Sequence, residues 1–170
     1  GYYCLAAETS ISNGTAEAAW ASLDVALSGT EYILAGDRSV FSLCRPPGHH
    51  ASYDQFGGYC FINNAAVAAQ HLRDRGLGKV AVLDVDFHHG NGTQAIFYNR
   101  SDVLFLSLHG DPMHAFPHFL GHADEVGLAE GEGFNCNYPM PPGTSFSKWC
   151  KVLEAALSQI SKFGADALIV

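Results

Sequence analysis

Residues 80–92 read Val80-Ala81-Val82-Leu83-Asp84-Val85-Asp86-Phe87-His88-His89-Gly90-Asn91-Gly92. The first four are apolar, two of them β-branched valines, which predicts a strand buried on both faces of a sheet. The Asp, His and Gly residues that follow are typical of a site at the C-terminal edge of a strand, where open parallel sheets bind ligands. The stretch therefore predicts an α/β fold with a polar site directly after a central strand.

Two side chains of this stretch are spaced as metal ligands. Asp86 and His88 lie two positions apart, so in extended backbone both point to the same side. A carboxylate oxygen and an imidazole nitrogen that converge on one point suit a divalent metal of the zinc type. Asp84 precedes them on the same face and is predicted to orient a neighbouring histidine. The alternative is a solvated polar loop, which we disfavour because carboxylates after a buried strand need partners.

A second polar stretch reads R-P-P-G-H-H-A over residues 45–51. Two prolines and a glycine favour an extended turn that presents His49 and His50 at the end of a strand. Histidine titrates near neutral pH, so an adjacent pair favours acid–base chemistry. A His-His pair in a loop is often without function, and it is the combination with residues 84–88 that supports a site.

The remaining chain alternates between helical and strand patterns. Thr15 is expected to cap a helix that ends before Gly29, with Trp20, Leu23 and Leu27 in the core. Alternating elements predict a mostly parallel sheet sandwiched by helices. Residues 109–133 form a long segment without periodicity, which is expected to be functional. Helices are predicted over residues 16–27, 63–75, 92–98 and after the cap Ser145, and strands over 39–44, 103–108, 134–138 and 167–170.

Bulk composition limits the function classes. The chain has 170 residues, enough for one domain with a core, and a formal net charge of -8, which argues against a nucleic-acid surface. No apolar run is long enough for a membrane span. The five cysteines are scattered without a CxxC pair, which predicts reduced thiols and a cytoplasmic location. The missing initiator Met and the apolar end at Val170 favour an internal piece of a longer protein.

Five motifs in order carry a resemblance to a known family: RPPGHHA, FGGYCFINNAA, LDVDFHHGNGT, LFLSLHGDP and PPGTSFSKW. Together they resemble the histone deacetylase and acetylpolyamine amidohydrolase family over nearly the whole chain. Residues 110–125 are most similar to its bacterial acetylpolyamine branch. The resemblance implies the arginase–deacetylase α/β fold, with residues 1–170 as part of a single catalytic domain. It also implies hydrolysis of an acetamide on an amine to acetate and free amine.

The resemblance implies a role for each polar residue of the two stretches. Asp86 and His88 would be two of three metal ligands, with zinc usual and iron(II) or cobalt as alternatives. His50 aligns with the general base and His49 with its electrostatic partner. The remaining implied contacts are a hydrogen bond from His49 to Asp84 and one from His50 to Asn91, where some relatives carry an Asp.

The resemblance also implies a narrow substrate channel and a bound potassium ion. Gly58, Tyr59 and Phe116 match the channel, and Glu8 would place an acidic group near its mouth. Relatives carry the third metal ligand and an oxyanion-binding Tyr beyond the position of Val170, so this chain alone is expected to bind zinc poorly and to be inactive. The implied structural potassium ligands are Asp84, Asp86, His88, Ser107 and Leu108.

The favoured function is therefore zinc-dependent deacetylation of small acetylated amines, above all acetylpolyamines. Acetyl-lysine in proteins is the alternative substrate. A binuclear manganese hydrolase of the arginase type would need more carboxylates around Asp86, and a non-catalytic binding protein would have no need of the intact histidines. A homodimer is expected only by analogy with polyamine-type relatives.

Overall fold

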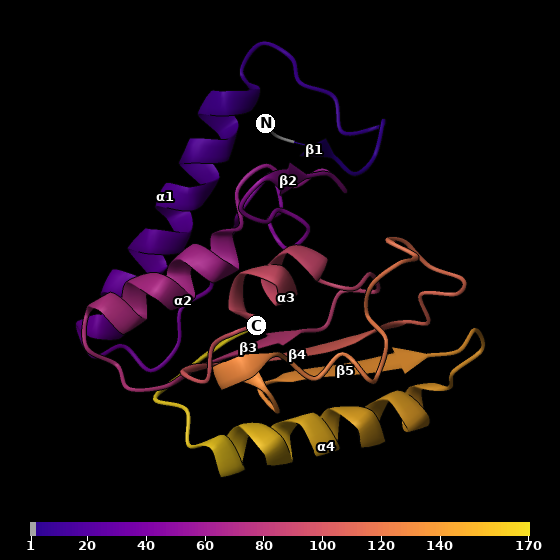
Figure 1. The fold of residues 1–170 in the computed structure, drawn as a ribbon. Coiled ribbons are helices and arrows are strands. Elements are labelled where there is room, and N and C mark those ends of the chain that lie inside the picture. Colours follow the sequence, from indigo (N-terminus) through magenta and orange to yellow (C-terminus); the bar gives the residue numbers. More distant parts are fainter. Residues whose placement is uncertain (1–2) are drawn as a thin grey trace.

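The computed structural model describes residues 3–170 and is organised around a four-stranded parallel sheet in the order β5-β4-β3-β6 (Figure 1). Val80 of β3 pairs with Val103 of β4 and Ala167 of β6, and Phe105 pairs with Asn135 of β5. In chain order the elements are β1 (Tyr3–Cys4), α1 (Thr15–Leu34), β2 (Gln55–Phe56), α2 (Asn64–Asp74), β3 (Val80–Asp84), α3 (Asn91–Phe97), β4 (Val103–Gly110), the 3-10 turn η1 (Ala129–Gly131), β5 (Asn135–Met140), α4 (Phe146–Phe163) and β6 (Ala167–Ile169).

Helices cover both faces of this sheet. Figure 1 shows α2 and α3 on one side of the sheet and α4 on the other. Because successive strand residues point to opposite faces, Val80 and Val82 pack under α2 and α3 while Ala81 and Leu83 pack against α4. β3 is thus buried on both faces, as its apolar run predicts, and the α/β sandwich is confirmed.

The cap predicted at Ser145 is confirmed, and the helix predicted to start at residue 63 is capped by Asn63. The Asn63 side chain accepts a hydrogen bond from the Ala66 amide at the start of α2, and Ser145 accepts one from Lys148 at the start of α4. Such caps satisfy backbone donors that have no partner inside the helix. Gly164 is the C-cap of α4, and its φ of +70° suits a residue without Cβ.

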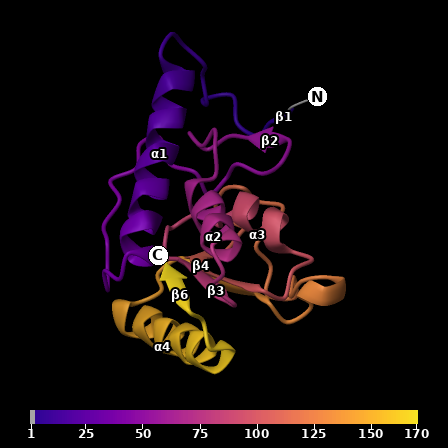
Figure 2. The ribbon, with the colours of Figure 1, turned by 90° about the vertical axis from the view of Figure 1, so that its left-hand side faces the viewer.

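The prediction for the first helix is wrong at both ends. α1 runs seven residues beyond the predicted end at residue 27, through Gly29 to Leu34, and its N-cap is Gly14 rather than Thr15. Gly29 lies inside the helix at a close contact with residue 42: a Cβ on Gly29 would lie 2.3 Å from the Ser42 hydroxyl oxygen. Trp20 is 61% exposed and is not part of the core. α1 packs against α2 and reaches beyond the sheet (Figure 2).

The predicted strand over residues 39–44 is also wrong, since the structure assigns no strand there. Phe41 is 85% exposed and Leu43 is 78% exposed, so the apolar character of this segment does not come from burial among residues 3–170. Strand propensity alone does not make a strand without a neighbour to pair with. The small parallel pair β1–β2, which lies next to the turn of residues 45–51, was not predicted.

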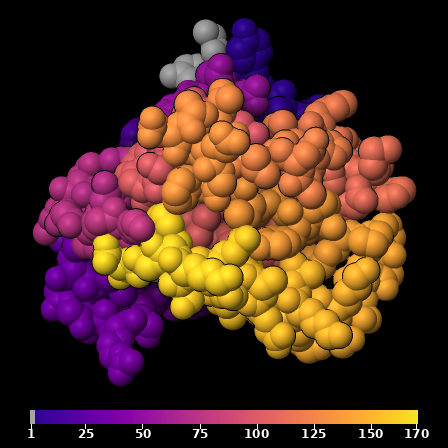
Figure 3. All heavy atoms as spheres, turned by 60° about the horizontal axis from the view of Figure 1, so that its bottom comes forward, coloured from indigo at the N-terminus to yellow at the C-terminus, as the bar shows by residue number. Residues whose placement is uncertain are grey.

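The outer face of α4 forms one side of the molecule. In Figure 3 the yellow C-terminal residues of α4 and β6 lie across the lower part of the view, and orange loop residues lie above them. Within residues 3–170, no helix is both long and apolar enough to cross a membrane. All five cysteines carry free thiols, as predicted.

Candidate active site

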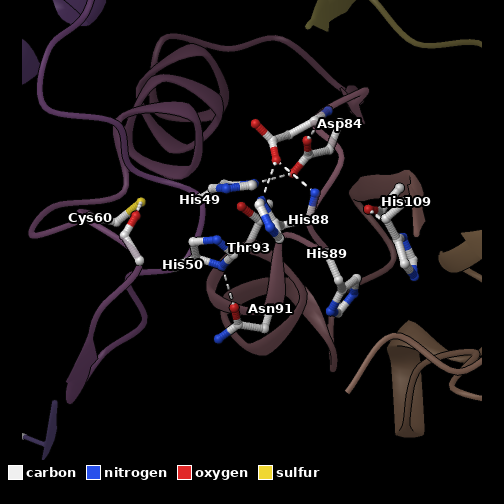
Figure 4. Close-up of polar contacts among 12 residues, drawn as sticks. His49, His50, Cys60, Asp84, His88, His89, Asn91, Thr93 and His109 are labelled. Atoms are coloured by element: carbon white, nitrogen blue, oxygen red, sulfur yellow. Dashed lines mark hydrogen bonds and ion pairs between the residues drawn. The ribbon is translucent and has the colours of Figure 1, made fainter. Parts of the chain in front are cut away.

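The two adjacent histidines of the second polar stretch have different partners (Figure 4). His49 Nδ1 lies 2.8 Å from Asp84 Oδ2, and His50 Nδ1 lies 2.7 Å from Asn91 Oδ1. The two rings are 4.0 Å apart between centroids. Both contacts expected from the resemblance are therefore present. An amide or carboxylate oxygen only accepts hydrogen bonds, so each ring carries a proton on Nδ1 and donates a hydrogen bond from it. Nε2 of each ring is then left available for other contacts.

The pKa values of the two imidazoles are shifted in opposite directions. Burial and the neighbouring His49 lower the pKa of His50 to about 4, although Asn91 favours its charged form. Burial also acts to lower the pKa of His49, but the hydrogen bond and charge of Asp84, with Asp86, outweigh it and raise that pKa. At neutral pH His50 is thus a neutral imidazole that can accept a proton, beside a histidine that is protonated more readily than an ordinary imidazole.

Backbone contacts fix the turn that carries these histidines. The first amides of α3, Gly92 and Thr93, both donate to the His49 carbonyl, at 2.9 and 3.2 Å. Asn63, the cap of α2, donates from Nδ2 to the Ala51 carbonyl at 2.9 Å. The turn is therefore held between the N-termini of two helices, which supply backbone and side-chain donors that need acceptors.

Two glycines allow other segments to touch the site. A Cβ on Gly58 would lie 2.1 Å from Cδ2 of His50, so only glycine lets this turn approach the imidazole. A Cβ on Gly90 would lie 2.2 Å from Oδ2 of Asp84, the acceptor of the His49 bond. Gly58 also has a φ of +53°, in the left-handed region that favours glycine.

Asp86 and His88 come together, although not by the extended backbone that we predicted. β3 ends at Asp84, and the chain turns so that the His88 amide donates to Asp86 Oδ1 at 2.7 Å. The same oxygen lies 3.3 Å from His88 Nδ1, and both side chains are about half exposed. Neighbouring ligands of a tetrahedral zinc with bonds of about 2.0–2.2 Å are separated by roughly this distance. The pair therefore fits two positions of a zinc site. Residues 3–170 contain no cluster of three such ligands.

The structure separates the residues expected in the substrate channel into two places. The Phe116 ring stands edge-on to His50, 4.9 Å between centroids, and 6.2 Å from His88. Tyr59 is exposed and, with Glu8, lines a hollow of about 760 Å³ next to the turn of residues 45–51. Phe116 and Gly58 thus lie against His50, while Tyr59 and Glu8 lie in the outer hollow.

Of the five residues expected to bind potassium, Asp84, Asp86 and His88 belong to the site described above, and the other two lie on β4. Ser107 and Leu108 are buried on β4, and Ser107 is the register partner of Asp84. His109 Nε2 lies 2.9 Å from the Gly121 carbonyl, which can only accept, so Nε2 carries the ring proton. Its Nδ1 then accepts from the Ser107 hydroxyl at 2.8 Å, which leaves the Ser107 oxygen lone pairs free. A hydroxyl oxygen with free lone pairs fits a monovalent cation.

The sequence analysis missed a buried polar cluster behind His88. His89 and His109 lie 4.6 Å apart between ring centroids, and burial together with His109 lowers the pKa of His89 to about 3. Figure 4 shows both rings on the side away from His49. The only sequence signal was the spacing of Asn135 and Asn137, two polar side chains on one face of a strand. The cluster is completed by Gln94, Glu125, Asn135 and Asn137.

The sheet and its paired histidines define an α/β protein with a histidine-containing polar site at the C-terminal edge of parallel strands. A family model for the histone deacetylase domain matches residues 3–170. The chain belongs to the histone deacetylase family.

Within that family, the chain is similar to proteins named acetylpolyamine amidohydrolases. The chain is 62% identical to the acetylpolyamine amidohydrolase of Mycoplana ramosa and 58% identical to acetylpolyamine amidohydrolase 2 of Pseudomonas aeruginosa, each over the whole chain. It spans about half the length of these curated relatives. The crystal structure of the acetylpolyamine aminohydrolase from Burkholderia pseudomallei superposes with a TM-score of 0.86 at 48% identity, covering 88% of this chain and 44% of that one.

Proposed function

We propose that the gene product containing this chain is a zinc-dependent deacetylase of acetylated amines, with acetylpolyamines as its preferred substrates. The observation that carries the proposal is the position of His50, a neutral imidazole whose ring centroid lies 6.1 Å from that of His88. The identity of 62% to an acetylpolyamine amidohydrolase supports the substrate class.

In this proposal each polar side chain has one task. His50 donates a hydrogen bond from Nδ1 to Asn91, and its Nε2 accepts a proton from the attacking water. His49, held by Asp84, keeps positive charge near the carbonyl oxygen that becomes negative. Asp86 and His88 would hold the zinc with donors from outside these residues. When bound, zinc makes water more acidic and polarises the substrate carbonyl.

The surroundings support a thin, cationic substrate. The Phe116 ring beside His50 would form one wall for an alkyl chain, and aromatic faces attract cations. Tyr59 and the Glu8 carboxylate in the outer hollow would meet a second, charged amine of the substrate.

We further propose that a potassium ion binds at Ser107 and Leu108 and that the protein forms a homodimer. We also propose a cytoplasmic location, because thiols stay reduced in that compartment.

The test compares substrates in the full-length gene product. With zinc, it is expected to release acetate from N-acetylputrescine faster than from an acetyl-lysine peptide, and a chelator is expected to abolish both. The 170-residue chain alone is expected to be inactive. Faster turnover of the peptide would favour the protein-lysine alternative. Acetate release by the isolated 170-residue chain, or no release by zinc-loaded full-length protein, would contradict the proposal.

A further inference from the structure

The segment from residue 111 to residue 134 carries Phe116 but has little regular structure. Within this segment the structure assigns only η1 as a helix and no strand. The Phe116 ring nevertheless stands 4.9 Å from His50, so the position of the segment decides how wide the site is beside the imidazole. On its N-terminal side the segment is held by the Gly110 amide, which donates to the Phe87 carbonyl at 2.8 Å. After Phe116, the segment is held by contacts of Gly121 and Glu125.

Gly121 is one of the points at which the segment touches the buried cluster, besides the His122 carbonyl, which accepts from Asn137 Nδ2 at 3.2 Å, and Glu125. The Gly121 amide donates to Glu125 Oε2 at 2.9 Å, and its carbonyl accepts from His109 Nε2 at 2.9 Å. A Cβ on Gly121 would lie 2.8 Å from both His109 Nε2 and His89 Cγ. With a φ of +104° as well, this position suits only glycine. Both polar groups of Gly121 are thus fixed, five residues after Phe116.

Glu125 connects this point to the framework of the fold. Besides the Gly121 amide, its Oε2 accepts from Gln94 Nε2 of α3 at 2.5 Å and lies 3.4 Å from Asn137 Nδ2 of β5. Its carbonyl accepts from Asn135 Nδ2 at 2.6 Å. α3 begins at Asn91, the partner of His50, so Glu125 joins the segment to the element that orients the imidazole.

The carboxylate also sets the orientation of the Gln94 amide. Because a carboxylate only accepts, the Gln94 nitrogen must face Glu125 and its oxygen must face His89. The Gln94 oxygen then also accepts from Asn135 and Asn137, at 2.9 and 2.8 Å. A neutral, non-accepting side chain at position 125 would leave this buried amide free to turn, and unpaired buried polar groups are costly.

We propose that Glu125 is a positioning residue for the substrate channel: through Gly121 it keeps Phe116 beside His50. The inference rests on the proposed function only for its kinetic readout. Glu125 does not touch the substrate, so its loss is expected to act through Phe116. Loss of a charge-assisted bond is expected to raise KM for N-acetylputrescine about tenfold with little change in kcat, the signature of lost binding rather than lost chemistry.

The first arm of the test measures the segment itself and requires no activity. Amide hydrogen exchange is compared between wild type, Glu125→Ala and Asp124→Ala, with Glu125→Gln as the conservative change that keeps an acceptor oxygen. Asp124 is the matched control, an exposed neighbouring carboxylate with no side-chain hydrogen bond among residues 3–170. Faster exchange over residues 111–124 in Glu125→Ala, with α2 and β3 unchanged and a smaller effect in Glu125→Gln, is expected. Exchange equal to that of Asp124→Ala, or faster exchange throughout the sheet, would overturn the proposal.

The second arm is a double-mutant cycle in the full-length, zinc-loaded protein. Kinetics of Glu125→Ala, Phe116→Ala and the double variant are compared, with Glu125→Gln as the conservative change. If Glu125 acts through Phe116, the rise in KM caused by Glu125→Ala disappears in the Phe116→Ala background. The same rise in both backgrounds would overturn the proposal. If Glu125→Ala does not fold, Glu125→Gln takes its place in the cycle.

The two arms separate the two claims. A wild-type protein without deacetylase activity would refute the proposed function but leave the exchange result to decide whether Glu125 holds the segment. Normal activity with unchanged exchange and an additive cycle would refute the role of Glu125 and leave the proposed function standing.

Discussion

His49 and His50 are neighbours in the chain, and their rings lie 4.0 Å apart, yet their pKa values move in opposite directions. Burial acts in the same sense on both imidazoles, because it disfavours the charged form. The difference lies in the partner: Asp84 offers His49 a negative charge, whereas Asn91 offers His50 an oxygen without one. One site thus contains a neutral base and a histidine that is protonated more readily than an ordinary imidazole. The comparison teaches that partner charge, more than burial, assigns the two roles.

The largest expected effect comes from removing the neutral base. His50→Ala in the full-length enzyme is expected to lower kcat/KM by about 10²–10⁴, the usual contribution of a positioned proton acceptor. Steady-state kinetics with N-acetylputrescine provide the measurement, and His71→Ala, in the last turn of α2 with Glu31 as its partner, is the control away from the site. A loss of less than about tenfold would show that His50 is not the base.

The next effect is on stability and follows from the lowered pKa of His50. Unfolded histidine titrates near 6.5, and folded His50 at about 4, so between these pH values the unfolded state binds more protons. Stability from this group is therefore complete above pH 6.5 and is lost as the pH falls towards 4, by about 3 kcal/mol. Urea unfolding of metal-free protein at pH 6.5 and 4.5 measures it. His50→Asn is expected to show a smaller fall; an equal fall would contradict the assignment.

A smaller and more specific change gives His50 the kind of partner that His49 has. Asn91→Asp is expected to raise the pKa of His50 by about 1–2 units, because a carboxylate within hydrogen-bond distance favours the imidazolium. An NMR titration of the ring protons measures the shift. The converse variant Asp84→Asn is expected to lower the pKa of His49. If Asn91→Asp leaves His50 unchanged, burial rather than partner charge controls the site.

The fold was largely predictable because its central strands are continuous apolar runs. Residues 80–84 and 103–108 are buried on both faces, so their character does not depend on details of pairing. The end of α1 was not predictable, because a glycine usually marks the end of a helix. Gly29 instead lies inside α1, where it makes a close contact with residue 42. The strand predicted over residues 39–44 was wrong because a strand needs a paired neighbour, which a local pattern does not reveal.

The site was predictable in part, and for a different reason. Spacing placed Asp86 near His88, but through a turn that the alternation of a strand does not describe. The partners of His49 and His50 came from the resemblance rather than from local chemistry. Glu125 was missed because residues 109–133 have no periodicity, and its partners Gln94 and Asn137 lie 31 and 12 positions away. Long-range polar contacts of this kind leave no local pattern.

The central claim is that two adjacent histidines carry different protonation states because their partners differ. The most direct test is nitrogen-detected NMR of both imidazole rings in the metal-free chain at pH 6. We expect His50 neutral with its proton on Nδ1, and His49 mainly protonated on both nitrogens. A protonated His50, or a His50 that carries its proton on Nε2, would contradict the account.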